Sequence, residues 1–548
     1  MDTNYWTNRR VTRRTVLRGS ALGALGLAGA ALIGCGSDKD GDQVATVADG
    51  KAAPAQAPLT FKRGGTVRMG TPALSTGLDP TFSGAGYHKT ALAFDTLLGI
   101  GADGLATIRD DALASSVEQV DKTTIVMKLR PGVKFHDGTP FNAQSVVWNV
   151  GRTLQPKPPA ALPHKAQVQY VSKVEAVDET TVRWILKQPD AGIFTAFTDT
   201  SCQMLSPTHY EGKSIADVMW KPVGTGRYMF KEYSADSFVK YRSNPDYFFK
   251  LPDGKSAGMV DEIHELAIPD AIARAASLQA GNLEVLDESP ATQLDLLNAD
   301  KNLLGVKAEG FAIRNAYINH DVAPLNNVDF RRALAWAWDP VAQNKVFDNG
   351  IGKTATSALP SLSWAHIAVP DFPTFDLARA MKYLEASNVP KAERKVLITG
   401  DTLYFQFLQD AWAKIGVTAE YVKDATNRLN KNAGAKNPDV HMSVGSRITT
   451  RQDPGWQLGA MLRSDSIYNY GLAPTGAING LTDKGQATYD IKERKAIYAE
   501  VQKIAADQQY SMFYKVEIPF WVHTRKPLQG ARHFGTGRGD YRYLHFSA

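Results

Sequence analysis

The sequence predicts a mixed α/β fold, because two patterns alternate along its 548 residues. Apolar and polar residues alternate over segments such as 123–130, which is typical of half-buried strands. Apolar residues recur at three- and four-residue spacing over segments such as 329–338, which is typical of helices. Since both kinds of element are mixed throughout, the class is α/β or α+β. The length allows two to three domains of about 100–200 residues each.

Residues 1–34 have the pattern of an export signal. A basic stretch with five arginines precedes a short, weakly apolar run over residues 19–33. That run is shorter than the ~20 residues that a helix needs to cross a bilayer, so we expect a removable leader rather than a membrane span. Residues 12–18 (TRRTVLR) resemble the twin-arginine signal for folded cargo. The alternative is a general secretory leader that happens to contain paired arginines.

Cys35 stands where the apolar run stops, directly after Leu32-Ile33-Gly34. This arrangement resembles a lipobox, in which the cysteine is acylated and becomes the new N-terminus; the alternative is a chance cysteine beside an ordinary cleavage site. With Cys35 lipidated, Cys202 has no partner for a disulfide, and we expect it to be a small buried apolar residue. Residues 35–61 are rich in Ala, Gly, Pro and Asp, which predicts a flexible tether.

The charge of the chain gives no support for nucleic-acid binding. The formal net charge is +6, of which the leader carries +4 through five arginines and one aspartate, so +2 is left for the mature part. A nucleic-acid partner would require a clustered basic face. We therefore expect no nucleic-acid partner.

The folded body is expected to begin near residue 62, with a glycine turn that leads into a strand over 66–70. The strand over 123–130 is expected to end at Pro131-Gly132. Asn142 then stands before a run of apolar residues at helical spacing, where its side chain can cap the helix.

A short internal repeat predicts two similar β-hairpins. Residues 117–124 (VEQVDKTT) match residues 174–181 (VEAVDETT), and each precedes an alternating segment. We expect the hairpins to turn at Asp121-Lys122 and Asp178-Glu179. Two copies are too few for a solenoid.

Further along the chain, apolar runs at helical spacing follow single aspartates, whose side chains can accept the first free backbone N–H groups. Trp336 and Trp338 have the spacing of core residues in such a helix, so we expect them in the core rather than in a ligand site. A late helix is expected over 494–506. The expected capping residues are Asp270, Asp329 and Asp339.

Motifs for enzymatic chemistry are absent from the sequence. Neither a G-x-S-x-G elbow nor an H-E-x-x-H motif occurs. His136-Asp137-Gly138 is interpreted as a turn, and Gly224-Thr225-Gly226 lacks the Lys-Ser/Thr of a phosphate-binding loop. The histidines are scattered singly, without the spacing of a zinc site. We therefore expect a protein that is not an enzyme and that needs no metal or cofactor.

Six segments, taken together, resemble a known family. Each is a weak signal alone, but the set in this order is specific and spans nearly all of residues 62–548. It resembles the family 5 extracellular solute-binding proteins, which serve oligopeptide, dipeptide and nickel importers. The segments are Gly64-Gly65-Thr66-Val67-Arg68, Leu78-Asp79-Pro80, residues 128–140 (KLRPGVKFHDGTP), Val223-Gly224-Thr225-Gly226, Asn244-Pro245-Asp246-Tyr247 and residues 329–339 (DFRRALAWAWD).

The resemblance implies a type II periplasmic-binding-protein fold of two lobes with a hinge, plus an inserted subdomain. The ligand lies between the lobes, which close over it. By the layout of the family, the insert is expected over 101–221 and lobe two over 311–507. Lobe one is expected to combine residues 62–100, 222–310 and 508–548.

The resemblance also implies a function. The chain is expected to be a monomeric solute-binding lipoprotein on the outer face of the cytoplasmic membrane, in the periplasm or at the cell surface. It would capture a peptide or a related small organic solute and deliver it to the permease subunits of an ABC importer with their ATPases. Alternatives stay open: a receptor of the same fold for an acidic or N-blocked solute, a metal chelate or an oligosaccharide, or a ligand sensor.

Candidate ligand contacts come from segments that line the cleft of the family. Aromatic walls suit organic ligands in such sites. For the three aromatic candidates, packing within a lobe is the alternative. The candidates are Gly84, Gly86, Tyr87, Arg447, Thr450, Asp453, Trp456 and Tyr514.

One of these segments bears on the chemistry of the ligand. In the peptide receptors that the chain resembles, an Asp three residues before an acidic-Pro pair binds the α-amine of the peptide. Asp453-Pro454 matches the acidic-Pro pair, so Thr450 takes the amine-binding position, and Arg447 stands where an aromatic residue is common. We interpret this as a cleft that lost a cation site and gained an anion site, because Arg pairs with carboxylates and phosphates. The alternative is a shifted register in which Asp453 itself binds the amine.

The proposed anchor gives a direct prediction. Replacing Cys35 by serine removes the thiol that would carry the lipid, so the Cys35→Ser protein is expected in the medium or periplasm rather than on membranes. Fractionation followed by immunoblotting measures this. Unchanged retention of the variant on membranes would contradict the prediction.

Overall fold

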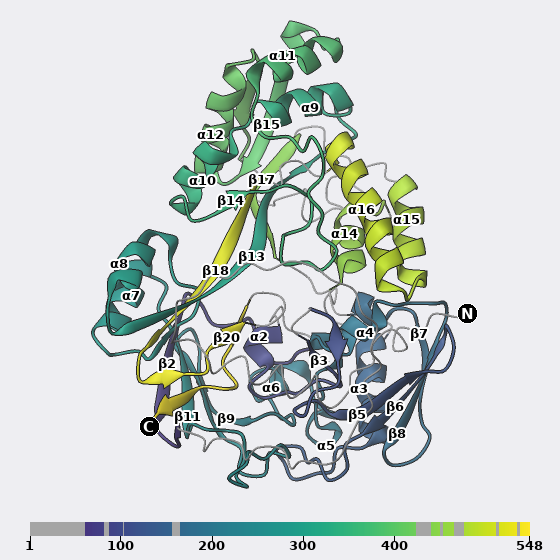
Figure 1. Ribbon diagram of the computed structural model, residues 1–548, viewed down its shortest axis with the longest axis vertical. Coiled ribbons are helices and arrows are strands. Elements are labelled where there is room, and N and C mark those ends of the chain that lie inside the picture. Colours follow the sequence, from purple (N-terminus) through teal and green to yellow (C-terminus); the bar gives the residue numbers. More distant parts are fainter. Residues whose placement is uncertain are drawn as a thin grey trace, which may run out of the picture.

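The computed structural model describes residues 61–548 except for 82–86, 102–103, 156–164, 424–439, 450–452, 465–475, 511–514 and 534–537. Figure 1 shows two lobes, one above the other. We call residues 61–302 and 526–548 the lower lobe and residues 319–515 the upper lobe. Two strands, β13 (Leu303–Ile318) and β18 (Val516–Arg525), run through both lobes.

A single eleven-stranded sheet passes from one lobe to the other. Strands β13 and β18 lie side by side at its centre and are antiparallel. From its upper edge the sheet runs β16 (Thr418–Tyr421), β15 (Lys395–Gly400), β17 (Met442–Thr449), β13, β18, β12 (Val285–Leu286), β2 (Thr66–Thr71), β11 (Glu262–Ala267), β10 (Phe238–Ser243) and β9 (Tyr228–Ser234), with β14 (Lys353–Thr354) paired to β18.

The lower lobe contains a second sheet, built from the two predicted hairpins. Its order is β5 (Ala114–Gln119), β6 (Thr124–Leu129), β8 (Thr181–Leu186) and β7 (Val171–Ala176). In each turn an aspartate carboxylate accepts a backbone N–H two residues on, Asp121 from Thr123 at 2.7 Å and Asp178 from Thr180 at 2.8 Å. The two hairpins of the repeat are thus confirmed. They share one sheet because β6 pairs with β8.

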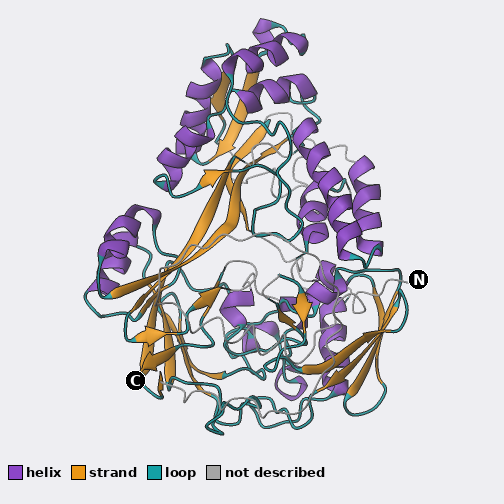
Figure 2. Ribbon diagram, viewed as in Figure 1, coloured by secondary structure: helices purple, strands orange, loops and turns teal. Residues whose placement is uncertain are grey.

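Helices surround the strands of the upper lobe, whereas the lower lobe has strands at both sides and shorter helices between them (Figure 2). In the upper lobe lie α9 (Val328–Trp336), α10 (Pro340–Asp348), α11 (Leu377–Ala386), α12 (Thr402–Ala413), α14 (Pro454–Leu462), α15 (Gly476–Ala487) and α16 (Ile491–Gln508). In the lower lobe lie α2 (Tyr87–Thr90), α3 (Ala143–Leu154), α4 (Ile193–Ala196), α5 (Pro207–Tyr210), α6 (Ile215–Val218), α7 (Ala271–Gln279) and α8 (Leu294–Ala299).

Short strands complete the lower lobe. The first and last described strands pair with each other, which joins the two ends of the described chain. One small sheet contains β1 (Phe61–Lys62), β22 (His545–Ser547) and β19 (Leu528–Gln529). Two further pairs are β20 (Arg532–His533) with β21 (Gly539–Asp540), and β3 (Gly99–Ile100) with β4 (Ala106–Thr107).

The predicted helix caps are confirmed at Asn142, Asp270 and Asp339. The prediction for Asp329 was wrong by two residues. Asn327 caps α9, because its side-chain oxygen accepts the N–H groups of residues 329 and 330 at 2.9 and 3.1 Å. Asp329 lies in the first turn, where a negative charge is favourable, and pairs with Arg332 at 2.8 Å.

The two strands that join the lobes are interrupted at the same level. Ala308 pairs with Phe520 and Ala312 with Ile518, so residues 309–311 of β13 form a bulge opposite Pro519. Gly310 in this bulge has a φ of 60°, in the left-handed region that favours glycine. Proline lacks an N–H for the ladder, and a bulge bends and twists a strand. The hydrogen-bond ladder between β13 and β18 is therefore interrupted at this level.

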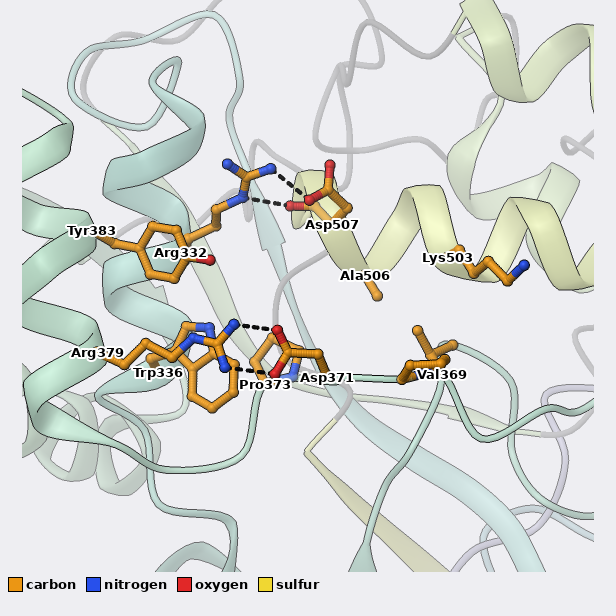
Figure 3. A pocket seen from close by; sticks show the side chains of 11 residues that line it. Arg332, Trp336, Val369, Asp371, Pro373, Arg379, Tyr383, Lys503, Ala506 and Asp507 are labelled. Atoms are coloured by element: carbon orange, nitrogen blue, oxygen red, sulfur yellow. Dashed lines mark hydrogen bonds and ion pairs between the residues drawn. The ribbon is translucent and has the colours of Figure 1, made fainter.

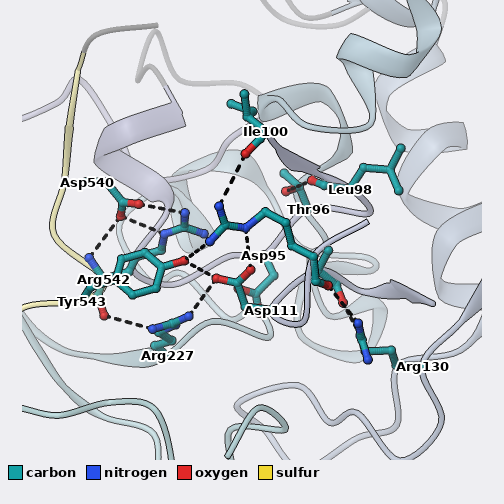
Figure 4. A network of polar contacts seen from close by, with 12 residues as sticks. Asp95, Thr96, Leu98, Ile100, Asp111, Arg130, Arg227, Asp540, Arg542 and Tyr543 are labelled. Carbon is teal, nitrogen blue, oxygen red and sulfur yellow. Dashed lines mark hydrogen bonds and ion pairs between the residues drawn. The ribbon is translucent and has the colours of Figure 1, made fainter. Parts of the chain in front are cut away.

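A buried network of charges fixes the C-terminal segment to the lower lobe (Figure 4). Asp111 accepts hydrogen bonds from Arg109 (2.9 Å), Arg227 (2.8 Å) and the hydroxyl of Tyr543. Burial alone would raise the pKa of Asp111, but the surrounding guanidinium groups, including that of Arg542, hold it well below its ordinary value. Asp111 is thus an ionised centre that segments far apart in the sequence share.

Cys202 is fully buried in the core of the lower lobe and is a free thiol, as predicted. Burial raises the pKa of this thiol to about 12. Trp336 and Trp338 are buried in the core of the upper lobe, also as predicted. Among the residues that the structure describes, none of the helices combines the length and the apolar character that crossing a membrane requires.

Candidate functional site

Four of the eight predicted ligand contacts lie within the described residues, and four lie outside them. Tyr87 begins α2 in the lower lobe, and Arg447 lies on β17 of the upper lobe, where its Cα is in register with that of Arg314. Asp453 and Trp456 lie at the start of α14. As ligand contacts, all eight stay predictions. Gly84, Gly86, Thr450, Tyr514 and the lipidation site Cys35 lie outside the described residues.

The acidic-Pro pair is the start of helix α14. Asp453 is the capping residue, and its Oδ1 accepts the N–H of Gly455 at 2.9 Å. Pro454 occupies the first helical position, where its missing N–H is not needed. The residue types at this point therefore have a local structural reason, independent of any ligand.

A buried arginine satisfies the carboxylate of Asp453. Arg494, near the start of α16, donates from Nη2 to the two carboxylate oxygens at 3.1 and 2.9 Å and from Nε to the carbonyl of Gly485 at 2.9 Å. Both side chains are 2% exposed. Burial would lower the pKa of Arg494, but Asp453 and Tyr498 raise it above its ordinary value. Both carboxylate oxygens of Asp453 are thus engaged with Arg494, and the side chain is hardly exposed to a ligand amine.

Two glycines let the helices close around this pair. A Cβ at Gly455 would lie 2.3 Å from the hydroxyl of Tyr498, and a Cβ at Gly485 would lie 2.7 Å from its ring. Tyr498 follows Arg494 by one helical turn and accepts a hydrogen bond from it at 3.1 Å. The sequence predicted the helix that carries Arg494 but offered no sign that this arginine meets Asp453.

The two lobes touch directly beside this ion pair. The backbone N–H of Ala191 donates to the carbonyl of Gln486 at 2.7 Å. The N–H of Asp190 donates to the hydroxyl of Tyr489 at 3.1 Å, and that hydroxyl donates to the carbonyl of Lys122 at 2.7 Å. In Figure 1 this contact lies where α4 and the β5–β8 sheet meet α14, α15 and α16, on the side away from β13 and β18. No pattern in the sequence indicated that these residues meet.

A separate pocket of about 300 Å³ opens between α9, α11 and α16 of the upper lobe (Figure 3). Four of its charged side chains form two ion pairs across the lining. Arg379 lies over the ring of Trp336 at 3.9 Å and binds both carboxylate oxygens of Asp371, while Arg332 binds Asp507 at 2.6 Å. Of the predicted ligand contacts that the structure describes, Tyr87, Arg447, Asp453 and Trp456, none lines this pocket.

The motifs His136-Asp137-Gly138 and Gly224-Thr225-Gly226, which could suggest a catalytic or phosphate site, are hydrogen-bonded to each other. His136 donates from Nε2 to the carbonyl of Gly226 at 2.9 Å and accepts the N–H of Gly224 at Nδ1 at 3.4 Å. Burial lowers the pKa of His136 to about 4, so the ring is neutral at pH 7. The interpretation as turns is confirmed. Within the described residues, no group of three or more His, Cys, Asp and Glu side chains is placed to hold a metal ion.

Comparison with known proteins assigns the chain to a family. The family model for bacterial extracellular solute-binding proteins, family 5 (middle region), matches residues 110–469, about two thirds of the chain. The chain belongs to the family 5 extracellular solute-binding proteins. The resemblance that the sequence motifs indicated is thereby confirmed, and the chain is a solute-binding protein of the ABC importer class.

Relatives and solved structures agree with this assignment. The glutathione-binding protein GsiB of Shigella flexneri is 28% identical over 400 residues, which cover 70% of this chain and 76% of that protein. The substrate-binding protein CtaP of Listeria monocytogenes superimposes with a TM-score of 0.74 at 23% identity, over 89% of this chain and all of CtaP. The oligopeptide-binding protein AppA of Bacillus subtilis, solved with a nonapeptide, gives 0.73 at 20% identity, over 89% of this chain and all of AppA. The type II periplasmic-binding-protein fold with two lobes is confirmed.

The buried ion pair of this family 5 protein can be tested by unfolding. Replacing Arg494 by methionine leaves the Asp453 carboxylate buried without its cation, which is expected to lower the free energy of unfolding by about 3–5 kcal/mol. Urea denaturation followed by fluorescence measures this. Lys503→Met is the matched control on the same helix, because its pair with Glu500 is half exposed, and it should change stability little. Equal, small effects of both substitutions would contradict a structural role for Arg494.

Proposed function

We propose that this chain is the lipid-anchored receptor of an ABC importer, which captures a peptide or a related small organic solute outside the cytoplasm. It delivers this solute to permease subunits that ATPases drive. The observation that carries the proposal is a two-lobed body of family 5 whose lobes are joined by a strand pair with an interrupted ladder. Glutathione and a nonapeptide, named for GsiB and AppA, are both peptides, which favours a ligand of this class.

The hinge is the bulge at residues 309–311 with Pro519 opposite. The boundary expected between the lobes, after residue 310, falls inside this bulge. Rotation there breaks few hydrogen bonds, because the ladder is already interrupted. The other expected boundaries, including the insert over 101–221, belong to the same proposal.

The proposed location and mode of action follow from the leader. An export signal, Cys35 at its end and a tether of about 27 residues over 35–61 would hold the folded body at the outer face of the membrane. We propose export by the twin-arginine route, a monomeric receptor and no turnover of the ligand. The neutral, hydrogen-bonded His136 and the fully paired Asp453 support the last point, because neither is free to act as an acid or base.

For the ligand itself, we propose a peptide-like solute without a free N-terminal amine, bearing an acid group or a masked amine. The Asp453–Arg494 pair supports this reading, because it uses the one carboxylate of residues 447–453. Thr450 at the amine-binding position carries no charge, and Arg447 would suit an anionic group. Binding an unpaired amine in a closed cleft would cost several kcal/mol.

Calorimetric titration decides between these ligands. Ordinary di- to pentapeptides are expected to bind weakly, and N-acetylated counterparts more tightly. The Thr450→Asp protein restores a carboxylate at the amine position, so it should gain affinity for the unmodified peptides and lose it for the acetylated ones. Tight binding of unmodified peptides that is lost on acetylation would contradict the proposal and restore Asp453 as the amine partner.

A further inference from the structure

The contact between the lobes beside Asp453 includes three hydrogen bonds and a buried aromatic side chain. Residues 190–192, just before α4, meet residues 486–489, which form the end of α15 and the start of its connection to α16. Three hydrogen bonds cross the boundary: Ala191 to Gln486 and, through the hydroxyl of Tyr489, those with Asp190 and Lys122. On the side of the lower lobe, all three use only backbone groups, so they require a fixed path of the chain.

Tyr489 also inserts its ring into the lower lobe. It is 5% exposed and belongs to the apolar core that the β5–β8 sheet forms with α3 and α4. Its ring packs edge-on against Phe194 of α4, with centroids 6.2 Å apart and planes at 76°. Ile491 of the upper lobe packs against the same core. If the lobes separated, this aromatic side chain would return to water.

We propose that residues 190–192 and 486–489 form a latch that holds the lobes closed on the side away from the hinge strands, with Asp190 as its proton-sensitive element. This inference rests on the proposed function, because a latch has a role only where the lobes open and close. The latch contributes to the free energy of lobe closure independently of contacts with the solute.

Asp190 is the group in the latch whose charge lacks a counterion of its own. It is 4% exposed, and its Oδ1 accepts the N–H of Gly192 at 3.0 Å. A Cβ at Gly192 would lie 3.0 Å from that oxygen and 4.0 Å from Cγ of Asp453, so only a narrow space separates the two acids. Arg494 is nearby, but it is already bound to Asp453. The other titratable groups that face this contact are Tyr489, Tyr498 and, next to Tyr489, Asp121.

The surroundings of Asp190 make closure depend on pH. Burial and then the charge of Asp453 raise the pKa of Asp190 from 3.8 to about 7 in the closed form. In the open form the upper-lobe groups withdraw, and we expect a pKa close to the ordinary value. A raised pKa means that closing takes up a proton. The closed form therefore becomes more stable relative to the open form as pH falls from about 7 to about 4. The closed-to-open ratio should rise up to about tenfold per pH unit in that window and level off on either side.

Distance measurements by electron spin resonance test the latch without any added solute. Spin labels at Glu179→Cys and Lys495→Cys, which are exposed in the lower and upper lobes, report on lobe separation in the Cys35→Ser protein. The unmodified latch should show a larger closed population at pH 5 than at pH 8. Asp190→Asn, which cannot ionise, should hold a large closed population at both values. Tyr489→Phe should lower the closed population at both, because the hydroxyl that bridges Asp190 and Lys122 is gone.

Tyr421→Phe is the matched control, because the hydroxyl of Tyr421 donates to the carbonyl of Gly400 within the upper lobe alone. Distance distributions that are the same in the unmodified, Asp190→Asn and Tyr489→Phe proteins would overturn the latch. If the lobes also keep one distance whether or not a solute is bound, the proposed hinge function fails with it. If they move on binding a solute while the latch variants match Tyr421→Phe, the latch alone is refuted.

Discussion

The pairing of β13 with β18 is the interaction on which the architecture depends. These two strands lie at the centre of a sheet that extends into both lobes, so their hydrogen bonds set how the lobes stand to each other. A continuous antiparallel ladder would make the pair stiff. The bulge at 309–311 and Pro519 interrupt it at one level, with Gly310 in a conformation that other residues rarely adopt. The sheet thus extends into both lobes and is interrupted at the level where we propose the hinge.

The buried aspartates differ in whether their contacts stay within one lobe. Asp111 in the lower lobe and Asp453 in the upper lobe each pair with a buried arginine, and each pair joins segments of a single lobe. Losing one partner of such a pair leaves an unpaired buried charge, which is costly. Asp190 differs, because it lies at the contact between the lobes, where its N–H donates to Tyr489, and Arg494 is already bound to Asp453. In the proposed latch its burial depends on closure, whereas theirs does not.

Much of the local structure could be predicted from the sequence because it depends on neighbouring residues. Alternation over 123–130 became β6, and Asn142 caps α3 through a reciprocal bond with Ser145, three residues on. The error at Asp329 arose because two candidate caps stand two residues apart, and the local pattern does not rank them. The family motifs added the two-lobed fold, which no local pattern contains.

The functional residues were harder to predict, because their partners are distant in sequence. Arg494 lies 41 residues from Asp453, and Tyr489 lies 299 residues from Asp190. Such pairs exist only once α14, α16 and the segment before α4 have packed, so neither spacing nor composition indicates them. Asp453 illustrates the consequence. From the sequence it could be a ligand contact or a structural residue, and the structure supplies the arginine that occupies it.

Small-angle scattering tests the central claim that this receptor works by turning its lobes about β13 and β18. The solute that co-purifies with the protein is identified by native mass spectrometry and then added back to protein from which it has been removed. If the lobes turn about these strands, the radius of gyration is smaller with the solute than without it. An unchanged radius of gyration, at solute concentrations where calorimetry shows full binding, would rule out this motion.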